Sequence, residues 1–307
     1  MKKTAGIHHI TAIVGHPKEN ADFYSSILGL RLVKKTVNFD DPQTYHLYFG
    51  NGTAEPGTII TFFPWTSGAQ GQIGGGQVGV TSYAVPPESL SFWENRLTEK
   101  GIVVHKTIRF FNETVLQFKD VHGLQLELVE REAGSQNTWS SDGLSPEVAI
   151  KGFAGAVLFS TNPESTIETL TGTMGLNQLS EEDNVVRLTT EGPSGHTIDV
   201  PLEAYSLGDM GTGTVHHIAW RASDETDHLE WQEHVREKGY QVTEIKDRNY
   251  FKALYFREYG KLLFEIASDT PGFTADEPLD SLGESLKLPK QYEKHRDELK
   301  RVLPLLN

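Results

Sequence analysis

The chain has 307 residues, with 28 Lys and Arg against 42 Asp and Glu, which gives a formal charge of −14 at pH 7. A chain this acidic is a poor candidate for binding nucleic acid or an anionic membrane surface, because both recruit basic patches. It contains no cysteine, which excludes disulfides, thiolate metal sites and a cysteine nucleophile.

Neither a transmembrane helix nor a signal peptide is predicted. No apolar run approaches 18 residues, and His8 and His9 interrupt the apolar segment that follows the N-terminal lysines. A cytoplasmic location is therefore expected. The length is typical of about two domains, each long enough to bury a core.

One pattern occurs four times along the chain: a strand-like segment, a helix-like segment and three further strand-like segments. Three of the helix-like segments are predicted to end at Gly29, Gly101 and Gly239, because glycine is a favoured C-cap. The remaining segment is predicted to begin at Asn162-Pro163, a favoured N-cap residue followed by proline. The units open at residues 6–14, 77–85, 152–160 and 214–222. We therefore expect four βαβββ modules.

Composition indicates where the modules are joined. The stretch EAGSQNTWSSDGLSPE is rich in Gly and Ser and predicts a linker over residues 132–151. Modules one and two are expected over residues 1–131, and modules three and four over residues 152–267. Residues 268–307 are expected to form a C-terminal tail with an amphipathic surface helix at about residues 290–303.

Four βαβββ units between residues 6 and 267 resemble the vicinal-oxygen-chelate superfamily, which contains glyoxalases, bleomycin-resistance proteins and extradiol dioxygenases. The resemblance implies an α+β fold in which the four modules form two cup-shaped barrels of mixed β-sheet, with the helices outside. It also implies that a metal ion can lie inside a cup.

Modules one and four carry a His-His pair at the same place in their first strand, His8-His9 and His216-His217. Because side chains alternate between the two faces of a strand, only one histidine of each pair can point into a cup. His8 and His216 share a face with the apolar residues that follow them, and this face is expected to pack on the helix. His9 and His217 are therefore predicted to face the cup interior.

The last strand of module four, Leu262-Leu263-Phe264-Glu265-Ile266, directs Glu265 away from its apolar face and into the same cup. An ionised carboxylate on so apolar a strand needs a partner, and a cation is the natural one. Two histidines and one carboxylate form the facial triad that suits non-haem Fe(II), because positions stay open for substrate and O₂. His9, His217 and Glu265 are therefore predicted to be metal ligands.

Modules two and three serve as an internal comparison. At the positions taken to match His9 they carry Gly79 and Gly155, whereas their last strands retain Glu127 and Asp199. A cup formed by these modules is expected to hold no catalytic metal, and its carboxylates are interpreted as remnants or hydrogen-bonded core groups. The ligand positions also predict that modules one and four share one cup, and modules two and three the other.

Three other histidines are interpreted as structural. His46 lies on the strand TYHLYFG, and His122 and His196 lie in the turns before the last strands of modules two and three.

Glyoxalase-type isomerases of the superfamily take a fourth protein ligand, a carboxylate or an amide, from the last strand of the partner module. Here that strand, residues 58–65, contains neither, so three protein ligands are expected. With ligands from the first and last modules, the chain resembles the ring-cleaving dioxygenases that act on hydroquinones, including chlorinated ones. Conventional catechol extradiol enzymes take their first histidine from the third module, where this chain has Gly155.

The resemblance implies five further residues around the metal: His8, Thr11 and His216 beside the ligands, and Arg248 and Tyr255 ahead of the carboxylate ligand. Tyr255 is implied to orient the substrate and donate a proton, Arg248 to stabilise a phenolate or oxyanion, and His8 or His216 to act as an acid–base group. Structural alternatives stay open: hydrogen bonding within the sheet for the histidines, core packing for Tyr255 and a surface loop for Arg248.

The function implied by the resemblance is that of a non-haem Fe(II)-dependent, ring-cleaving, extradiol-type dioxygenase, which inserts both atoms of O₂ into a hydroquinone-type or catechol-type ring. The ligand set leaves Mn, Zn or Ni open as a surrogate for iron, because affinity alone does not enforce iron. The expected partners are a small aromatic substrate and O₂, without nucleic acid or membrane, and the sequence leaves a homo-oligomer open. Two alternatives remain: a glyoxalase-like metal-dependent isomerase or lyase, and a non-catalytic small-molecule-binding protein.

Overall fold

The computed structural model describes residues 2–139, 143–192 and 196–306, and within them the chain forms four βαβββ modules. Module one contains β1 (Ile7–Val14), α1 (Pro17–Asp22), the π-helical turn η1 (Phe23–Ile27), β2 (Arg31–Val37), β3 (Tyr45–Gly50) and β4 (Ile59–Pro64). Module two contains β5 (Gln77–Val85), α2 (Leu90–Glu99), β6 (Val104–Arg109), the 3₁₀ turn η2 (Phe110–Asn112), β7 (Glu113–Lys119) and β8 (Gln125–Glu130).

The second half repeats the pattern. Module three contains β9 (Gly152–Phe159), α3 (Pro163–Glu168), the π-helical turn η3 (Thr169–Thr173), β10 (Asn177–Glu182), β11 (Val185–Thr189) and β12 (Thr197–Pro201). Module four contains β13 (Thr214–Ala222), α4 (Glu225–Glu237), β14 (Lys246–Asp247), β15 (Phe251–Arg257) and β16 (Leu263–Pro271). The tail contains the short 3₁₀ helices η4 (Phe273–Ala275), η5 (Leu279–Ser281) and η6 (Lys290–His295), followed by α5 (Arg296–Val302).

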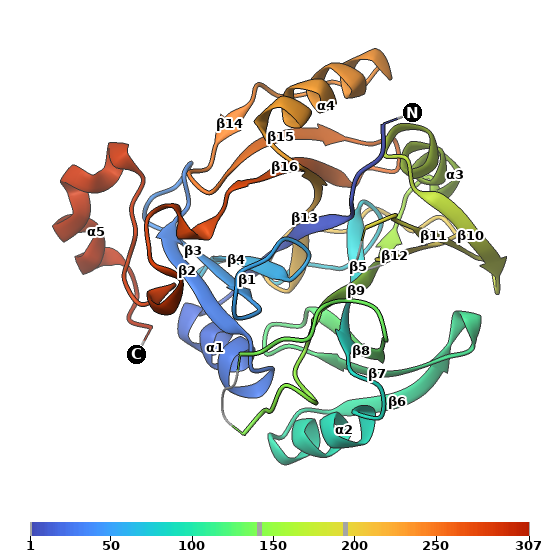
Figure 1. Ribbon diagram of the computed structural model, residues 1–307, viewed down its shortest axis with the longest axis horizontal. Helices are drawn as coiled ribbons and strands as arrows, with labels where there is room; N and C mark the ends of the chain where they lie inside the picture. Colours follow the sequence, from blue (N-terminus) through green and yellow to red (C-terminus); the bar gives the residue numbers. More distant parts are fainter. Residues whose placement is uncertain (1, 140–142, 193–195, 307) are drawn as a thin grey trace.

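The strands form two curled, mixed sheets, one from modules four and one and the other from modules three and two (Figure 1). Their strand orders are β14-β15-β16-β13-β1-β4-β3-β2 and β10-β11-β12-β9-β5-β8-β7-β6. The predicted pairing of modules one with four and two with three is therefore confirmed. In each module the last strand runs parallel to the first, and the first strands of paired modules meet antiparallel at the sheet centre.

The helices lie outside the sheets, with α2 and α4 at opposite ends of the molecule in Figure 1. They cover the apolar faces of the strands: Trp220 of β13 and Trp231 of α4, for example, are completely buried. The opposite, concave faces carry the polar residues discussed below. No helix among the described residues is long and apolar enough to cross a membrane.

Strand register makes one position equivalent in all four modules. In module four, Ala219 lies two residues after His217 on the first strand and pairs with Glu265 on the last strand. The equivalent position in each module is this last-strand residue. The four pairs are Thr61 with Thr11, Glu127 with Ser82, Asp199 with Val157, and Glu265 with Ala219. Three modules thus place a carboxylate at this position, and module one places a threonine there.

The same register corrects one sequence-based match. Ser82 pairs with Glu127 as Ala219 pairs with Glu265. Since His217 lies two residues before Ala219, its counterpart in module two lies two residues before Ser82, and this residue is Val80 and not Gly79. Gly79 corresponds to His216 instead and is skipped in the pairing of β5 with β9. A side chain there would meet the ring of Phe159 at 2.4 Å, which accounts for the glycine.

Candidate metal centre

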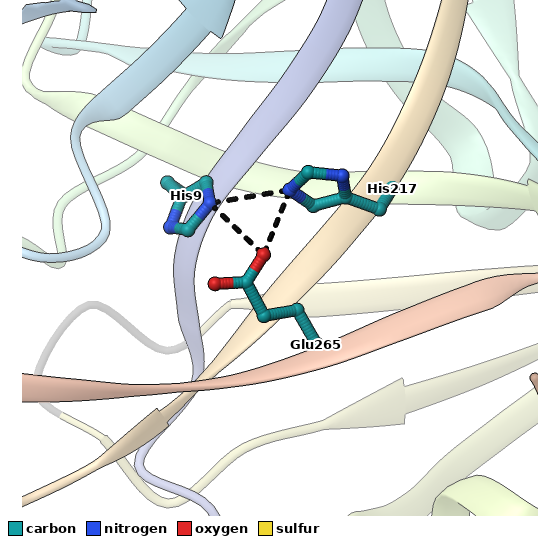
Figure 2. Close-up of side chains that lie close together, drawn as sticks. All are labelled: His9, His217 and Glu265. Atoms are coloured by element: carbon teal, nitrogen blue, oxygen red, sulfur yellow. Dashed lines mark hydrogen bonds and ion pairs between the residues drawn. The ribbon is translucent and has the colours of Figure 1, made fainter. Parts of the chain in front are cut away.

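Three side chains from three strands converge inside the first cup (Figure 2). The Nε2 atom of His217 lies 2.8 Å from Oε2 of Glu265, and the Nε2 atom of His9 lies 3.5 Å from the same oxygen. The two Nε2 atoms are 3.4 Å apart. His9, His217 and Glu265 are all buried, and they are the only group of potential ligands that meets among the described residues.

The donor set fits a divalent cation. Neither carboxylate oxygen of Glu265 has a hydrogen-bond donor among the described residues, and the residue is completely buried. Burial alone would raise the pKa of Glu265, but His9 and His217 hold that pKa well below its usual range. Two imidazole nitrogens and a carboxylate oxygen that share one buried space are the ligands expected for a non-haem metal.

Both His-His pairs lie at β-bulges, which the alternation argument did not foresee. In the pairing of β1 with β13, His8 is the extra residue between the pairs Ile7–Trp220 and His9–Ala219. A second register shift skips His216, between Thr11–His217 and Ala12–Val215. Because a bulge redirects a side chain, the neighbours of the two ligands also turn toward the cup.

The prediction that His8 and His216 pack on the helices is therefore wrong. The His8 ring lies 5.3 Å from the ring of Phe251, which also lies 5.0 Å from the His9 ring. His216 lines the same cavity as the ligand histidines, with its ring 5.7 Å from Phe63.

Each neighbour contacts its ligand histidine through Nδ1. The Nδ1 atoms of His8 and His9 are 2.9 Å apart, and those of His216 and His217 are 2.7 Å apart. An imidazole that binds a metal through Nε2 carries its proton on Nδ1, and in that tautomer each ligand histidine donates to its neighbour, which is then unprotonated at Nδ1. Burial, and then His217, lower the pKa of His216 to about 3, and burial lowers that of His8 well below its usual value. Both neighbours are therefore neutral hydrogen-bond acceptors.

A cavity of about 370 Å³ opens onto the three ligands. Its lining includes the aromatic residues Phe39, Phe63, Trp65, Phe251 and Tyr255, together with His46, His216 and Arg248. The volume and the flat apolar walls suit a single aromatic ring.

Tyr255 and Arg248 both reach this cavity. Tyr255 lies opposite Glu265 in the pairing of β15 with β16, and its ring centroid is 5.6 Å from that of His217. Burial, and then Glu265, raise the pKa of Tyr255 well above its usual value, so the phenol stays protonated at neutral pH. The Arg248 guanidinium lies 6.0 Å from the Tyr255 ring and donates to Asp40 at 3.0 Å.

Thr11 is buried beneath the cavity rather than in its lining. Its Oγ1 lies 3.0 Å from Oγ1 of Thr61, which is also 2.7 Å from Nε2 of His46. Nδ1 of His46 in turn lies in hydrogen-bonding distance, 2.8 Å, of the Tyr48 hydroxyl oxygen. Sequence reasoning treated His46 as structural, although the alternation of His46 and Tyr48 along β3 indicates that both face the cup.

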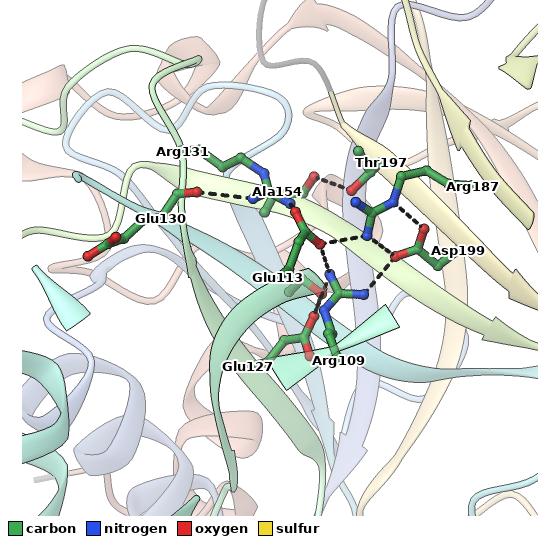
Figure 3. Close-up of polar contacts among 10 residues, drawn as sticks. Arg109, Glu113, Glu127, Glu130, Arg131, Ala154, Arg187, Thr197 and Asp199 are labelled. Atoms are coloured by element: carbon green, nitrogen blue, oxygen red, sulfur yellow. Dashed lines mark hydrogen bonds and ion pairs between the residues drawn. The ribbon is translucent and has the colours of Figure 1, made fainter. Parts of the chain in front are cut away.

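The second cup contains arginine where the first has its candidate metal site (Figure 3). The Arg109 guanidinium, at the end of β6, lies 3.1 Å from Glu127 and 2.8 Å from Asp199, the two carboxylates equivalent to Glu265. Arg187 makes two further contacts with Asp199. Glu127 and Asp199 are thus ion-paired core groups, one of the two roles expected from the sequence.

Comparison with known proteins places the chain in a family. The family model "Glyoxalase/Bleomycin resistance protein/Dioxygenase superfamily" matches residues 6–128 and 152–274. "Putative ring-cleaving dioxygenase MhqO" of Bacillus subtilis (strain 168) is 57% identical over 302 residues, which are 98% of this chain and 96% of that one. "Chlorohydroquinone/hydroquinone 1,2-dioxygenase" of Sphingobium indicum is 33% identical and covers 98% of this chain and 97% of its own length. A crystal structure of a "putative dioxygenase" from Bacillus subtilis subsp. subtilis str. 168 is 55% identical, with a TM-score of 0.98 over 100% of this chain and 99% of that one.

Proposed function

The chain belongs to the Glyoxalase/Bleomycin resistance protein/Dioxygenase superfamily, and on that premise we propose that it is a ring-cleaving dioxygenase that inserts both atoms of O₂ into a hydroquinone-type ring. The relatives named as ring-cleaving and hydroquinone dioxygenases cover nearly the whole chain. The observation that carries the proposal is the site itself, with three protein ligands beside a cavity walled by aromatic rings.

Fe(II) is the proposed metal, held by His9, His217 and Glu265. When bound, it supplies open coordination positions and the redox chemistry that activates O₂. Mn, Zn and Ni accept the same ligand types, because affinity alone does not select iron.

The chain's own residues prepare the reaction. His8 and His216 accept hydrogen bonds from the ligand histidines and so fix the orientation of both imidazoles. The aromatic walls hold the substrate ring and exclude water. Arg248 is placed to stabilise negative charge on a phenolate oxygen, and Tyr255 to orient the substrate and donate its phenolic proton.

The position of Thr61 favours this proposal over a glyoxalase-like isomerase. Thr61 is the counterpart of Glu265 by register, and it is a hydroxyl bonded to Thr11 and His46 rather than a carboxylate. Module one therefore offers no carboxylate at this position to act as a fourth protein ligand, which leaves more coordination positions for substrate and O₂.

Oxygen uptake tests the proposal. The anaerobic apoprotein is loaded with Fe(II) and mixed with hydroquinone, methylhydroquinone, chlorohydroquinone or catechol, while O₂ is followed with an electrode and products by ultraviolet absorbance. We expect one O₂ per ring cleaved, and loss of uptake in the His9→Ala and Glu265→Gln variants.

Glu127→Gln is the matched control, because it changes the equivalent carboxylate of the second cup. It should keep the turnover of each folded molecule close to that of the wild type. A protein that binds the metal stoichiometrically but consumes no O₂ with any of these phenols is not the proposed dioxygenase, and the isomerase and binding-protein alternatives would then be favoured.

A further inference from the structure

The C-terminal tail closes the gap between the two ends of the first sheet. In Figure 1 its red segment lies beside β2 and β3. Lys35 of β2 pairs in parallel with Leu286, and the amide of Lys287 donates to the carbonyl of Lys35 at 2.9 Å. Phe273, from the start of the tail, packs against the rings of both Tyr48 and Tyr250, which belong to modules one and four. The tail is thus part of the first cup and more than a surface appendage.

One carboxylate of the tail joins the two modules directly. Asp276 accepts from Nζ of Lys34 at 2.6 Å through Oδ1 and from the hydroxyl of Tyr250 at 3.0 Å through Oδ2. Lys34 is completely buried, has Glu277 as a second partner at 2.5 Å, and lies 4.7 Å above the Tyr250 ring. A lysine without solvent depends on these partners, so the arrangement is fixed strongly.

Both anchored residues are close in sequence to the mouth of the cavity. Lys34 lies on β2, which leads into Phe39 and Asp40, and the amide of Tyr250 donates to the carbonyl of Arg248 at 2.8 Å. Phe39, Asp40 and Arg248 all line the cavity. The Asp40–Arg248 ion pair, at 3.0 Å, spans the mouth from module one to module four.

The tail also contacts the rim of the cavity, formed by Phe39 and Asp40, at a second point. The hydroxyl of Tyr292 in η6 donates to the carbonyl of Phe39 at 2.9 Å. The Arg248 guanidinium lies 5.3 Å from the Phe39 ring and 6.0 Å from the Tyr255 ring, so a shift of the rim changes the setting of Arg248.

We propose that Asp276 is a positioning residue for the substrate cavity: by joining Lys34 to Tyr250, it fixes the distance between the Phe39–Asp40 rim and Arg248, and thereby the place where Arg248 meets the phenol. The inference rests on the proposed function for the identity of the ligand. It does not involve the metal ligands, which none of these contacts touches.

The test uses Asp276→Asn, an isosteric change that removes the negative charge opposite Lys34. Asp280→Asn is the matched control, because it neutralises an exposed carboxylate four residues along the same tail. Hydroquinone binding to the Fe(II)-loaded protein is measured without O₂ through quenching of tryptophan fluorescence, since Trp65 lines the cavity. We expect hydroquinone binding to weaken about tenfold in Asp276→Asn, with KM raised more than kcat is lowered, and no change in Asp280→Asn. Asp276→Glu should recover part of the loss, and Fe(II) affinity should stay the same.

Hydrogen exchange gives a readout that needs no ligand. Amides of residues 38–41 and 246–250 should exchange faster in Asp276→Asn than in Asp280→Asn, while those of β1 and β13 should not change. Tyr292→Phe should affect residues 38–41 alone. Wild-type exchange at the rim in Asp276→Asn would overturn the inference, and so would an equal loss of Fe(II) affinity, because the role would then be that of a general fold contact. Failure of the proposed function would instead appear as absent hydroquinone binding or O₂ uptake in the wild type, with the exchange result still decisive for Asp276.

Discussion

Replacement of Arg109 by Met removes the cation at the centre of the second cup. Arg109 contacts Glu113, Glu127 and Asp199. After the change Glu113 keeps Arg131 and Arg187, and Asp199 keeps Arg187. The loss therefore affects Glu127 most, which is buried and keeps only uncharged partners among the described residues.

The expected destabilisation follows from that one orphaned charge. Glu127 retains hydrogen bonds from Ser82, at 2.5 Å, and from Gln117. A buried carboxylate that loses its cation typically costs about 3–5 kcal/mol, so Arg109→Met should lower the free energy of unfolding by about that amount at pH 7. Burial already raises the pKa of Glu127 although Arg109 opposes the shift. In the variant this pKa should rise further, and the destabilisation should shrink toward pH 5 as the carboxyl becomes protonated.

Urea unfolding, followed by fluorescence and circular dichroism, measures the difference. Glu127→Gln in the Arg109→Met background should restore about 2 kcal/mol or more, because the orphaned charge is then absent. Lys106→Met is the matched control on the same strand, since Lys106 forms an exposed ion pair with Glu94 at 3.8 Å, and the change should cost less than about 1 kcal/mol. A loss below about 1 kcal/mol in Arg109→Met, or no recovery in the double variant, would refute the reasoning.

Two other changes test the first cup and the junction between the cups. His196 accepts a hydrogen bond from the amide of Ile7, and burial lowers its pKa to about 4. Because an unfolded histidine titrates at about 6.5, this residue should cost the protein about 3 kcal/mol of stability as the pH falls from about 6.5 to 4. His196→Asn, which keeps an acceptor but no titrating group, should show that much less acid sensitivity in urea titrations, and an unchanged pH dependence would contradict the burial argument. Thr61→Glu should add a fourth protein ligand to the metal. Its Co²⁺ affinity, measured by calorimetry, should rise about tenfold or more, and its O₂ uptake should slow. The control variant Thr61→Val should bind Co²⁺ like the wild type. Equal Co²⁺ affinity in both Thr61 variants would show that this position does not face the metal.

The module plan and the ligand set could be predicted from the sequence because both depend on local patterns. Period-two alternation and glycine-terminated helices mark each βαβββ unit, and an acidic residue at Glu265 interrupts an otherwise apolar strand. Two equivalent strands with histidines then leave few choices for the partners of that carboxylate. Joining modules one and four in a single cup follows from the ligands alone.

The bulges could not be predicted, because a register shift between two strands has no mark in either strand. Strict alternation of side chains along the strand predicted that His216 faces the helix, whereas the β-bulge directs its side chain into the cavity. The tail contacts escaped prediction for a related reason. Lys34 and Glu277 are 243 residues apart, and neither neighbouring sequence indicates that the lysine is buried.

The two cups solve the same electrostatic problem in different ways. The equivalent register position carries one carboxylate, Glu265, in the first cup and two, Glu127 and Asp199, in the second, and a carboxylate buried in this way requires positive charge nearby. In the second cup Arg109 and Arg187 supply that charge from within the chain, so Glu127 and Asp199 are neutralised without any added ion. In the first cup the partners of Glu265 are the imidazoles of His9 and His217, whose charge depends on protonation, rather than permanently charged guanidinium groups. Among the described residues no arginine or lysine pairs with Glu265, so the second cup is complete by itself and the first is suited to hold a metal.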